Sequence, residues 1–285
     1  PGEAPLMTAT ILDGRALAGT LRERLMREAA GFAARRGRRA KLALVAAGED
    51  PTAALYAGQV VRSCLRVGLD STVRSFAGDV AEETVRGAVA DLGASDTVEG
   101  VVLLLPLPPQ VRQRVVTEAL APEKDIDGLG PRNAGRLMLG FPSYVPSTAD
   151  AALELLRDAG IPLRGQNAVI VGRSNVGGKP TALQFLREEA TITICHSRTP
   201  DLAAITRQAD VLFTSTGQFG TITAAMIKPG AVVLDAGINA VDGQVRGDVD
   251  FDAVREVAGY ISPVPGGLGP LTNLILIRHA LLGPA

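Results

Sequence analysis

A short apolar run followed by a glycine-rich turn constrains the fold of this chain most strongly. Residues 167–171 (NAVIV) run directly into 172–178 (GRSNVGG), and an apolar-periodic segment follows over 181–186. This order predicts strand, glycine turn and helix. Such a turn lets a phosphate approach the backbone at a helix N-terminus, which attracts anions. The spacing G-x-S-x-x-G-G differs from the common dinucleotide fingerprint, so an ordinary strand-to-helix turn is the alternative.

The segments after this turn continue the same alternation. Strands are predicted over 191–195, 210–215 and 231–235, with a helix over 201–209 before the second of them. The last two strands end in small residues, Thr216-Gly217 and the run 236–239 (AGIN). Small residues at the carboxyl ends of parallel strands leave room for a cofactor across the sheet edge. The C-terminal half is therefore predicted to be a Rossmann-like nucleotide-binding domain.

The end of the predicted strand 191–195 bears on which dinucleotide is bound. In nucleotide folds this position faces the adenosine ribose, where an acidic residue favours a free 2′-hydroxyl. Here the chain reads His196-Ser197-Arg198-Thr199, without an acid. Arginine offers a planar fork of donors to phosphate oxygens, so Arg173, Ser197 and Arg198 favour NADP. A solvated surface arginine is the alternative for Arg198.

The N-terminal half has an α/β rhythm of its own. Helices are predicted over 16–34 and 51–67, and strands over 41–46 and 98–105. The run 106–109 (PLPP) follows the last strand and stops sheet pairing there. Ligands of open α/β sheets bind at such carboxyl ends, so this half is predicted to hold a second ligand.

Two acids follow in the run 123–128 (EKDIDG), before another helical piece that opens at Asn133. Asp125 and Asp127 are an i, i+2 pair, which in an extended segment shares one face. One of them is expected to cap local structure while the other reaches a ligand. A turn-forming acidic loop is the alternative.

The C-terminal segment combines a rigid loop with an apolar helix. Residues 262–272 (SPVPGGLGPLT) hold glycines and prolines that favour a compact loop whose backbone can approach a flat ligand. A plain structural turn is the alternative. The helix predicted over 273–282 is too apolar to stand alone, so it is expected to pack back on the N-terminal half.

Composition limits the partners of the chain. At 285 residues two domains are expected, and a net charge of -1 argues against nucleic acid or an anionic membrane as the main partner. No apolar run suggests a membrane span, and no signal pattern is seen, so a cytoplasmic protein is expected. Residues 1–6 resemble an expression remnant before a natural Met7. Cys64 and Cys195 suggest no disulfide framework, and the histidines and cysteines suggest no metal site.

With these segments in place, the chain resembles the methylenetetrahydrofolate dehydrogenase/cyclohydrolase family from about Ala9 to Leu282. The motifs that carry the resemblance are 55–64 (LYAGQVVRSC), 103–108 (LLLPLP), 122–128 (PEKDIDG), 171–178 (VGRSNVGG), 195–199 (CHSRT), 235–239 (DAGIN) and 263–272 (PVPGGLGPLT). Their order and spacing match the family. The resemblance implies an α/β chain of two domains, usually in a homodimer, with a tetrahydrofolate derivative as substrate and NADP as cofactor.

The resemblance also implies domain bounds and site residues. The folate-binding domain would span 7–146 with a returning helix over 268–283, and the Rossmann-like domain would span 147–267. Tyr56 would stack on the folate and Asp127 would hold its pterin edge, as the catalytic pair. Further substrate contacts are expected from Leu104, Pro265, Gly266, Gly267, Leu268 and Gly269. Cofactor contacts are expected from Gly172, Arg173, Ser174, Ser197 and Ile238.

The chain departs from the family pattern at two pocket positions. Members with both activities carry lysine one helical turn after the tyrosine, where this chain has Val60, and glutamine where it has Leu104. A third change, Ser147 for cysteine, keeps a small polar side chain. Gln59 precedes Val60 but lies about 100° away on a regular helix, which makes it a weak substitute.

These departures separate the two family reactions. Hydride removal from the carbon that bridges two folate nitrogens mainly needs positioning, whereas hydrolysis of the resulting cation needs proton transfers. An NADP-dependent dehydrogenase with weak or absent cyclohydrolase activity is therefore expected. Two alternatives stay open. One is a diverged member that acts by hydride transfer on a different amine or iminium, and the other is a non-catalytic protein that binds folate or NADP.

Overall fold

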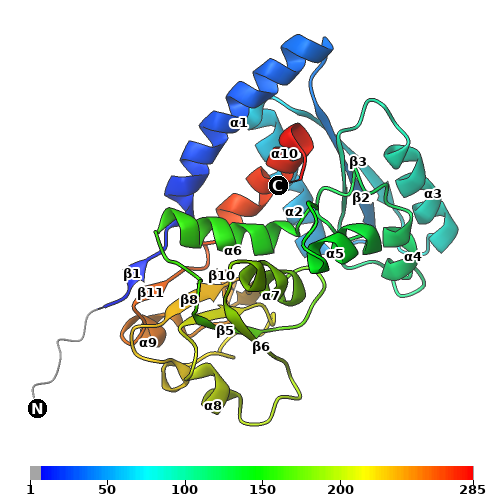
Figure 1. Cartoon of the computed structure of the whole chain (residues 1–285). Helices are drawn as coiled ribbons and strands as arrows, with labels where there is room; N and C mark the ends of the chain where they lie inside the picture. Colours follow the sequence, from blue (N-terminus) through cyan, green and yellow to red (C-terminus); the bar gives the residue numbers. More distant parts are fainter. Residues whose placement is uncertain (1–7, 285) are drawn as a thin grey trace, which may run out of the picture. The chain divides into compact units, whose positions relative to one another are not determined.

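The computed structural model describes residues 8–284 and divides them into two units (Figure 1). We call residues 8–18 with 147–272 the six-stranded unit, and residues 19–146 with 273–284 the three-stranded unit. The expectation for residues 1–6 and Met7 lies outside the described residues.

The structure corrects two of the expected bounds. The segment 8–18, expected in the N-terminal domain, belongs to the six-stranded unit because β1 (Thr10–Ile11) pairs in parallel with β11 (Tyr260–Ile261). Residues 268–272, expected with the returning helix, also belong to the six-stranded unit.

The six-stranded unit is built on a parallel sheet in the order β1-β11-β8-β7-β5-β6. Its central strands are β5 (Asn167–Val171), β7 (Val211–Thr214) and β8 (Val232–Asp235), with β6 (Thr191–Cys195) at one edge. All residues of β7 and β8 are buried, as expected for strands covered on both faces. The predicted bounds of β5 and β6 are confirmed, whereas β7 and β8 each begin one residue later than predicted.

Helices cover the sheet on both faces. Helices α6 (Ser147–Asp158) and α7 (Gly178–Arg187) lie side by side on one face (Figure 1). The other face packs against α8 (Leu202–Thr206), the 3-10 turn η1 (Ala224–Met226) and α9 (Phe251–Arg255), through side chains such as Leu202, Met226 and Phe251. The helix predicted over 201–209 is thus shorter, and Asp201 caps it by accepting from the Ala204 amide at 3.1 Å.

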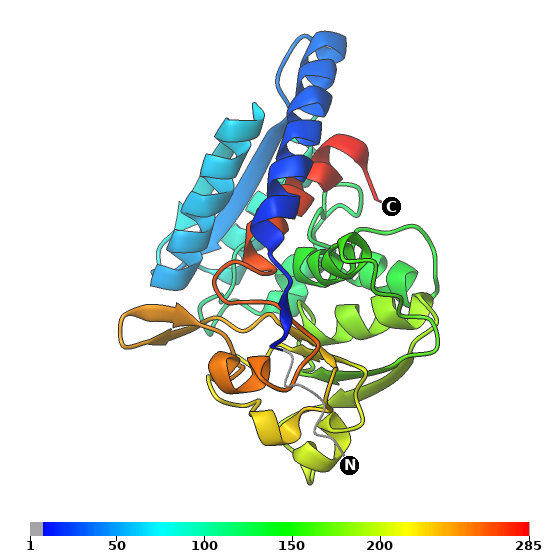
Figure 2. The ribbon, with the colours of Figure 1, turned by 90° about the vertical axis from the view of Figure 1, so that its left-hand side faces the viewer.

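A small antiparallel hairpin belongs to the same unit. It consists of β9 (Asn239–Val241) and β10 (Gln244–Arg246), and it forms a separate two-stranded sheet (Figure 2). The sequence did not predict it, because three-residue strands of mixed polarity leave no clear period.

The three-stranded unit is a parallel sheet in the order β3-β2-β4. Its strands are β2 (Lys41–Ala47), β3 (Asp70–Phe76) and β4 (Gly100–Leu103). Helices α3 (Glu82–Gly93) and α4 (Gln113–Glu118) pack on one face through a cluster that includes Val45, Val89, Leu103 and Val116. The remaining helices that involve this unit are α1 (Gly14–Arg36), α2 (Pro51–Val67), α5 (Pro131–Met138) and α10 (Gly269–Leu282).

The C-terminal helix confirms its expected return to the first half of the chain. Residues from Asn273 onward cluster with the three-stranded unit. Within that unit the His279 Nδ1 lies 2.7 Å from the Ile126 carbonyl oxygen, and the His279 ring lies 5.5 Å from the Tyr144 ring. The predicted α/β architecture with two units is therefore confirmed.

Candidate functional site

The glycine turn after β5 is shaped by close backbone approaches. Gly172 has a φ of +131°, and a Cβ there would lie 2.5 Å from the Ser215 carbonyl oxygen. A Cβ on Gly178 would lie 2.1 Å from the Gly172 carbonyl oxygen, and one on Gly177 would lie 2.7 Å from the Ser215 Oγ. At Gly172 and Gly178 the nearest atoms are backbone, so only glycine fits there without a backbone shift, whereas at Gly177 a Cβ would meet the Ser215 side chain. The turn is therefore packed as tightly as a backbone cradle for a phosphate requires.

Helix α7 begins inside this turn, three residues before the predicted start. It starts at Gly178, and its N-cap residue, Gly177, forms no side-chain cap. Ser174 braces the turn by accepting from the Gly177 amide at 3.0 Å. In the first turn of α7, the Lys179 amide donates to the Ser174 carbonyl oxygen at 3.1 Å and Pro180 has no N–H, so this end of the helix offers an anion the Gly178 amide and the positive end of the helix dipole. Asparagine and lysine next to it pair with each other, since Lys179 Nζ donates to Asn175 Oδ1 at 2.8 Å.

The turn after β6 presents the residues expected at a 2′-phosphate. The His196 amide donates to Thr199 Oγ1 at 2.9 Å, and the Arg198 amide donates to His196 Nδ1 at 3.1 Å. His196 and Thr199 thus fix the backbone, while the side chains of Ser197 and Arg198 are exposed. Arg173 at the neighbouring strand end is also exposed. Since β5 and β6 are parallel neighbours, these exposed donors follow the same edge of the sheet.

A pair of buried acids near the ends of β7 and β8 was missed by sequence reasoning: Asp235 is the last residue of β8, and Asp248 follows β10. Asp235 and Asp248 are 3% and 0% exposed, and the Asp248 amide donates to Asp235 Oδ1 at 3.0 Å. Burial, together with the charge of Asp248, raises the pKa of Asp235 to about 6. Asp235 in the run 235–239 (DAGIN) and Asp248 in the run 247–250 (GDVD) could be noticed in the sequence. Their proximity, however, arises only in the tertiary structure. Ile238 beside them is 66% exposed, as suits a residue that contacts a ligand.

The loop with Pro265, Gly266, Gly267, Leu268 and Gly269 folds against the start of α1. The Gly14 amide donates to the Gly266 carbonyl oxygen at 3.0 Å, and a Cβ on Gly14 would lie 1.8 Å from the Gly267 carbonyl oxygen. Arg15 Nη2 donates to the Pro265 carbonyl oxygen at 3.3 Å. Pro265 and Gly269 are exposed, whereas the Leu268 side chain is buried. The loop is thus held in place by these contacts. Its accessible surface comes from Pro265 and Gly269 and not from the buried Leu268 side chain.

Helix α2 positions Tyr56 and Val60 through well-defined ends. Asp50 caps the N-terminus by accepting from the Ala53 amide at 2.7 Å, and Gly68, with a φ of +98°, ends the helix. Tyr56 is half-buried, and Val60, one turn later, is 0% exposed. One further turn on, burial raises the pKa of the Cys64 thiol to about 12. This stripe of α2 is therefore apolar beyond the tyrosine.

Leu104 lies immediately after β4, which ends at Leu103 and not at 105 as predicted. Its amide still donates to the Val45 carbonyl oxygen at 2.9 Å, and its side chain is 2% exposed. The Leu105–Pro106 bond that follows is cis. Val60 and Leu104 are therefore both buried, and neither side chain has a group that can transfer a proton.

The acidic loop assigns its two carboxylates to different tasks. Asp125 accepts from the amides of Leu129 and Gly130 and from Asn133 Nδ2, at 2.8 to 2.9 Å. It therefore takes the capping role, and burial raises its pKa to about 6. Gly128, with a φ of +59° against the Tyr144 carbonyl oxygen, fixes the other end of the loop. Asp127 is 7% exposed and is the member of the pair that the sequence predicts to contact the ligand.

His279, on α10, contacts this loop and is a further residue that sequence reasoning missed. Its Nδ1 contacts the carbonyl oxygen of Ile126, the residue just before Asp127, at 2.7 Å. Ile126 is itself 0% exposed, and a Cβ on Gly100 would lie 2.5 Å from its side chain. The peptide that leads into Asp127 is thus held from two sides. A lone histidine in an apolar helix gave no sequence signal for this contact.

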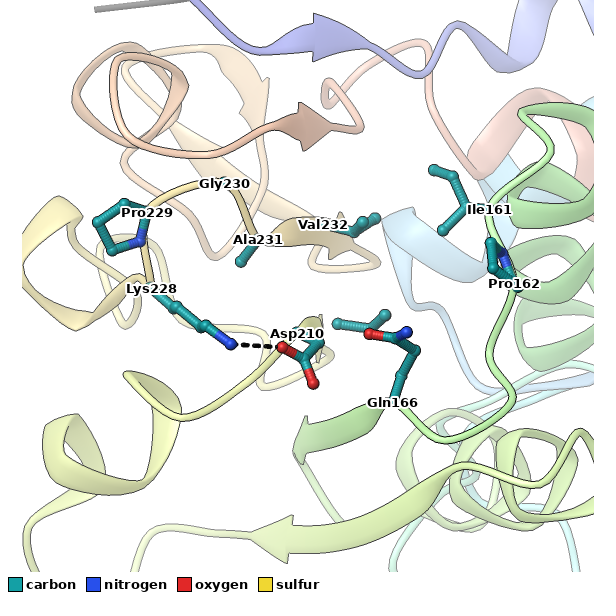
Figure 3. Close-up of a pocket in the computed structure, with 10 residues that line it drawn as sticks. Ile161, Pro162, Gln166, Asp210, Lys228, Pro229, Gly230, Ala231 and Val232 are labelled. Atoms are coloured by element: carbon teal, nitrogen blue, oxygen red, sulfur yellow. Dashed lines mark hydrogen bonds and ion pairs between the residues drawn. The ribbon is translucent and has the colours of Figure 1, made fainter. Parts of the chain in front are cut away.

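A well-formed pocket of the six-stranded unit lies at the opposite end of its sheet from the glycine turn (Figure 3). It is lined by Ile161, Pro162, Gln166, Asp210, Val211, Lys228, Pro229, Gly230, Ala231 and Val232, at the amino ends of β5, β7 and β8. Lys228 Nζ pairs with Asp210 Oδ1 at 2.5 Å, and the other oxygen of Asp210 accepts from the Asn167 amide at 2.9 Å. Its charges satisfy each other, so this pocket is not the candidate site.

Two further properties concern the described residues as a whole. Among the helices within residues 8–284, none is both long enough and apolar enough to cross a lipid bilayer. Over the same residues, no cluster of three or more His, Cys, Asp or Glu side chains is placed to hold a metal ion.

Comparisons with known proteins agree with this geometry. The catalytic domain of the tetrahydrofolate dehydrogenase/cyclohydrolase family matches residues 12–127, and its NAD(P)-binding domain matches residues 146–283. The bifunctional protein FolD of Geobacillus thermodenitrificans is 45% identical over 276 residues, which cover 96% of this chain and 97% of that protein.

Solved structures show the same likeness over the whole chain. The bifunctional FolD methylenetetrahydrofolate dehydrogenase/cyclohydrolase of Campylobacter jejuni superimposes with a TM-score of 0.93 at 34% identity, covering 96% of this chain and 98% of that one. The Trypanosoma brucei FolD, solved with NADP and an inhibitor, gives a TM-score of 0.91 at 34% identity and covers 96% of each chain. The chain therefore belongs to the tetrahydrofolate dehydrogenase/cyclohydrolase family.

Proposed function

We propose that this protein oxidises 5,10-methylenetetrahydrofolate to 5,10-methenyltetrahydrofolate with NADP, and that its cyclohydrolase activity is weak or absent. The observation that carries the second half is that Val60 and Leu104 are 0% and 2% exposed and apolar, at the positions where bifunctional members have lysine and glutamine. The first half is supported by the family membership and by the tight glycine turn before α7.

Dehydrogenation does not require a protein side chain to transfer a proton. The reaction removes a hydride from the carbon that bridges N5 and N10 of the folate, whose nitrogen lone pairs stabilise the resulting cation, and NADP, when bound, would supply the hydride acceptor. No proton is released, so the residues serve to bind and orient. In this proposal Tyr56 stacks on the folate and Asp127 holds its pterin edge. The contacts of Asp125 with Gly130 and of His279 with Ile126 support this by bracing the loop that carries Asp127.

On the cofactor side, the residues present fit NADP. Gly172, Gly177 and Gly178 let the backbone approach a phosphate, and the N-terminus of α7 offers the Gly178 amide and a partial positive charge. The exposed side chains of Arg173 and Ser197 suit the 2′-phosphate, and Ile238 offers apolar surface to the cofactor.

Cyclohydrolysis places a different demand on the pocket. Water adds to the methenyl carbon, a carbon–nitrogen bond then breaks, and protons must leave the water and reach the nitrogen. A side chain that transfers such protons contributes about 100- to 10,000-fold in rate. Valine and leucine transfer none, so the methenyl product is expected to leave the enzyme without being hydrolysed.

The proposal is tested by incubating the purified protein with methylenetetrahydrofolate and NADP and following the formation of NADPH. Substrate-dependent NADPH formation is expected. If NADPH forms only with a different amine or iminium, the protein is a diverged hydride-transfer enzyme. If NADP binds tightly and no such substrate is oxidised, the protein is a non-catalytic binding protein, and the dehydrogenase proposal fails.

We also propose that the protein is a cytoplasmic homodimer. Its two cysteines, Cys64 and Cys195, are free and buried, which agrees with a reducing compartment. Strand β3 lies at a sheet edge, most of its residues are exposed, and Val73 at its centre is 43% exposed. A long exposed edge strand offers unpaired backbone groups that a second copy can cover symmetrically.

Light scattering tests the homodimer and its proposed edge. The wild-type protein is expected to have twice the mass of the chain, and Val73→Asp is expected to reduce it to the monomer mass. Ile194→Asp is the matched control, because Ile194 is also 43% exposed on an edge strand, β6. A monomeric wild type would contradict the dimer, and a dimeric Val73→Asp variant would contradict the role of β3.

A further inference from the structure

The Asp248 carboxylate joins three separate segments of the six-stranded unit. Its Oδ2 accepts from Thr214 Oγ1 at 3.1 Å and from the Thr216 amide at 2.5 Å, both at the carboxyl end of β7. Its Oδ1 accepts from the Gln218 amide at 3.0 Å and from Asn239 Nδ2, at the start of β9, at 3.1 Å. Asp248 is 0% exposed, and each of its carboxylate oxygens accepts two hydrogen bonds, so its hydrogen-bonding capacity as an acceptor is satisfied within the protein.

Asp235 fixes the backbone that carries Asp248. Asp235 Oδ1 accepts from the Gly237 and Asp248 amides at 2.8 and 3.0 Å, and its Oδ2 accepts from the Val249 amide at 2.9 Å. The fit leaves no spare space, because a Cβ on Gly237 would lie 2.1 Å from Asp248 Oδ1 and one on Gly247 would lie 1.9 Å from Asp235 Oδ2. The end of β8 is thus tied to Asp248, and through it to the end of β7.

The glycine turn is coupled to the same network through Ser215. Asp248 holds Thr214 and Thr216, the two neighbours of Ser215 in the chain. The Ser215 carbonyl oxygen and Oγ are the atoms against which Gly172 and Gly177 pack. A shift of Thr214 or Thr216 therefore moves the surface that shapes the glycine turn.

From this geometry we propose that Asp248 is a positioning residue for NADP, which holds the turns after β7 and β8 and the glycine turn after β5 in register. The three turns follow the carboxyl ends of parallel strands, where ligands of such sheets bind. Asp248 does not contact the reacting atoms. The inference rests on the proposed function only in its choice of ligand.

Asp248→Asn is the primary test, because an amide retains the shape of the side chain but accepts on one side only. Its NH₂ group must then face one of the two donor pairs and leave buried donors unsatisfied. The dissociation constant for NADP, measured by calorimetry without folate, is expected to rise about 10-fold or more. In the catalysed reaction, the KM for NADP should rise while the KM for methylenetetrahydrofolate changes less than about twofold. A merely structural role would leave the KM for NADP unchanged.

Two further variants keep the test decisive. Thr214→Val removes one donor from a fully buried site without changing its volume, and a smaller rise in the dissociation constant for NADP, about 3-fold, is expected even if Asp248→Asn does not fold. Asp210→Asn is the control, since it changes an aspartate at the amino ends of the same strands and should leave NADP binding unchanged.

The outcomes separate this proposal from the proposed function. Wild-type affinity for NADP in folded Asp248→Asn, or in Thr214→Val if the first variant does not fold, would overturn the positioning role. A loss of affinity in Asp210→Asn equal to that in Asp248→Asn would also overturn it. A wild-type protein that binds NADP but oxidises no folate would refute the proposed function, while the binding comparison would still decide the role of Asp248.

Discussion

Replacing Val60 with lysine and Leu104 with glutamine in one chain is expected to raise the rate of methenyltetrahydrofolate hydrolysis about 100-fold or more. The two substitutions introduce an amine and an amide at buried positions that are apolar in this chain, and a positioned proton-transfer group contributes about 100-fold or more. Val60 is 0% exposed, so a lysine amine there would be desolvated and its pKa lowered toward the working pH. The measurement is the decay of methenyltetrahydrofolate with enzyme, compared with the uncatalysed decay.

The matched control for this gain replaces Val60 with methionine in the Leu104→Gln background. Methionine extends the side chain by a similar length without an amine, so any change due to packing alone appears in both variants. Thermal unfolding of each variant shows whether the buried lysine is tolerated. If the folded lysine variant hydrolyses methenyltetrahydrofolate no faster than the methionine variant, the valine at position 60 is not the cause of the proposed loss of cyclohydrolase activity.

Gly178→Ala is expected to abolish measurable NADP binding and, with it, dehydrogenase activity. The added Cβ would lie 2.1 Å from the Gly172 carbonyl oxygen and 2.9 Å from the Arg173 amide nitrogen, which are backbone atoms and cannot rotate away. The glycine turn must therefore open, and the start of α7 moves away from the proposed phosphate position. Calorimetric titration with NADP measures the loss.

Gly87→Ala is the control for the glycine substitution. Gly87 lies within α3, and a Cβ there would have no atom within 4 Å. Replacing glycine by alanine inside a helix stabilises it by about 0.5 to 1 kcal/mol, so NADP binding should be unchanged. Wild-type affinity in Gly178→Ala would show that the close packing of this turn is not needed for the cofactor.

Several elements could be predicted from sequence because strong local signals bound them. The bounds of α2 follow from Asp50 and Pro51 at its start and Gly68 at its end. Strand β5 is bounded by the glycine turn. By contrast, β3 (DSTVRSF) was not predicted, because its sequence is mostly polar and has no regular alternation of apolar residues. Such a sequence is tolerated because β3 lies at the edge of its sheet and most of its residues are exposed. The pairing of β1 with β11 joins residues about 250 positions apart, which no local pattern encodes.

Candidate site residues could be predicted from the sequence where they lie within one short motif. Residues brought together from distant segments could not be predicted. A capping role for one acid of the Asp125 and Asp127 pair was predicted, but which acid caps the loop depends on Gly130 and Asn133 being folded back onto it. The roles of Asp248 and His279 rest on hydrogen bonds to Thr214, at a distant strand end, and to Ile126, in a distant loop. Such contacts exist only after the sheet and the C-terminal helix are in place.

The central claim is that hydride transfer proceeds in this protein without hydrolysis of its product. It is tested most directly by following NADPH and methenyltetrahydrofolate separately in one reaction of the wild-type protein with methylenetetrahydrofolate and NADP. We expect the two products to accumulate in equal amounts, with methenyltetrahydrofolate then decaying at the uncatalysed rate. NADPH formation without accumulation of methenyltetrahydrofolate would contradict the claim, because it would show that the protein hydrolyses its own product despite Val60 and Leu104.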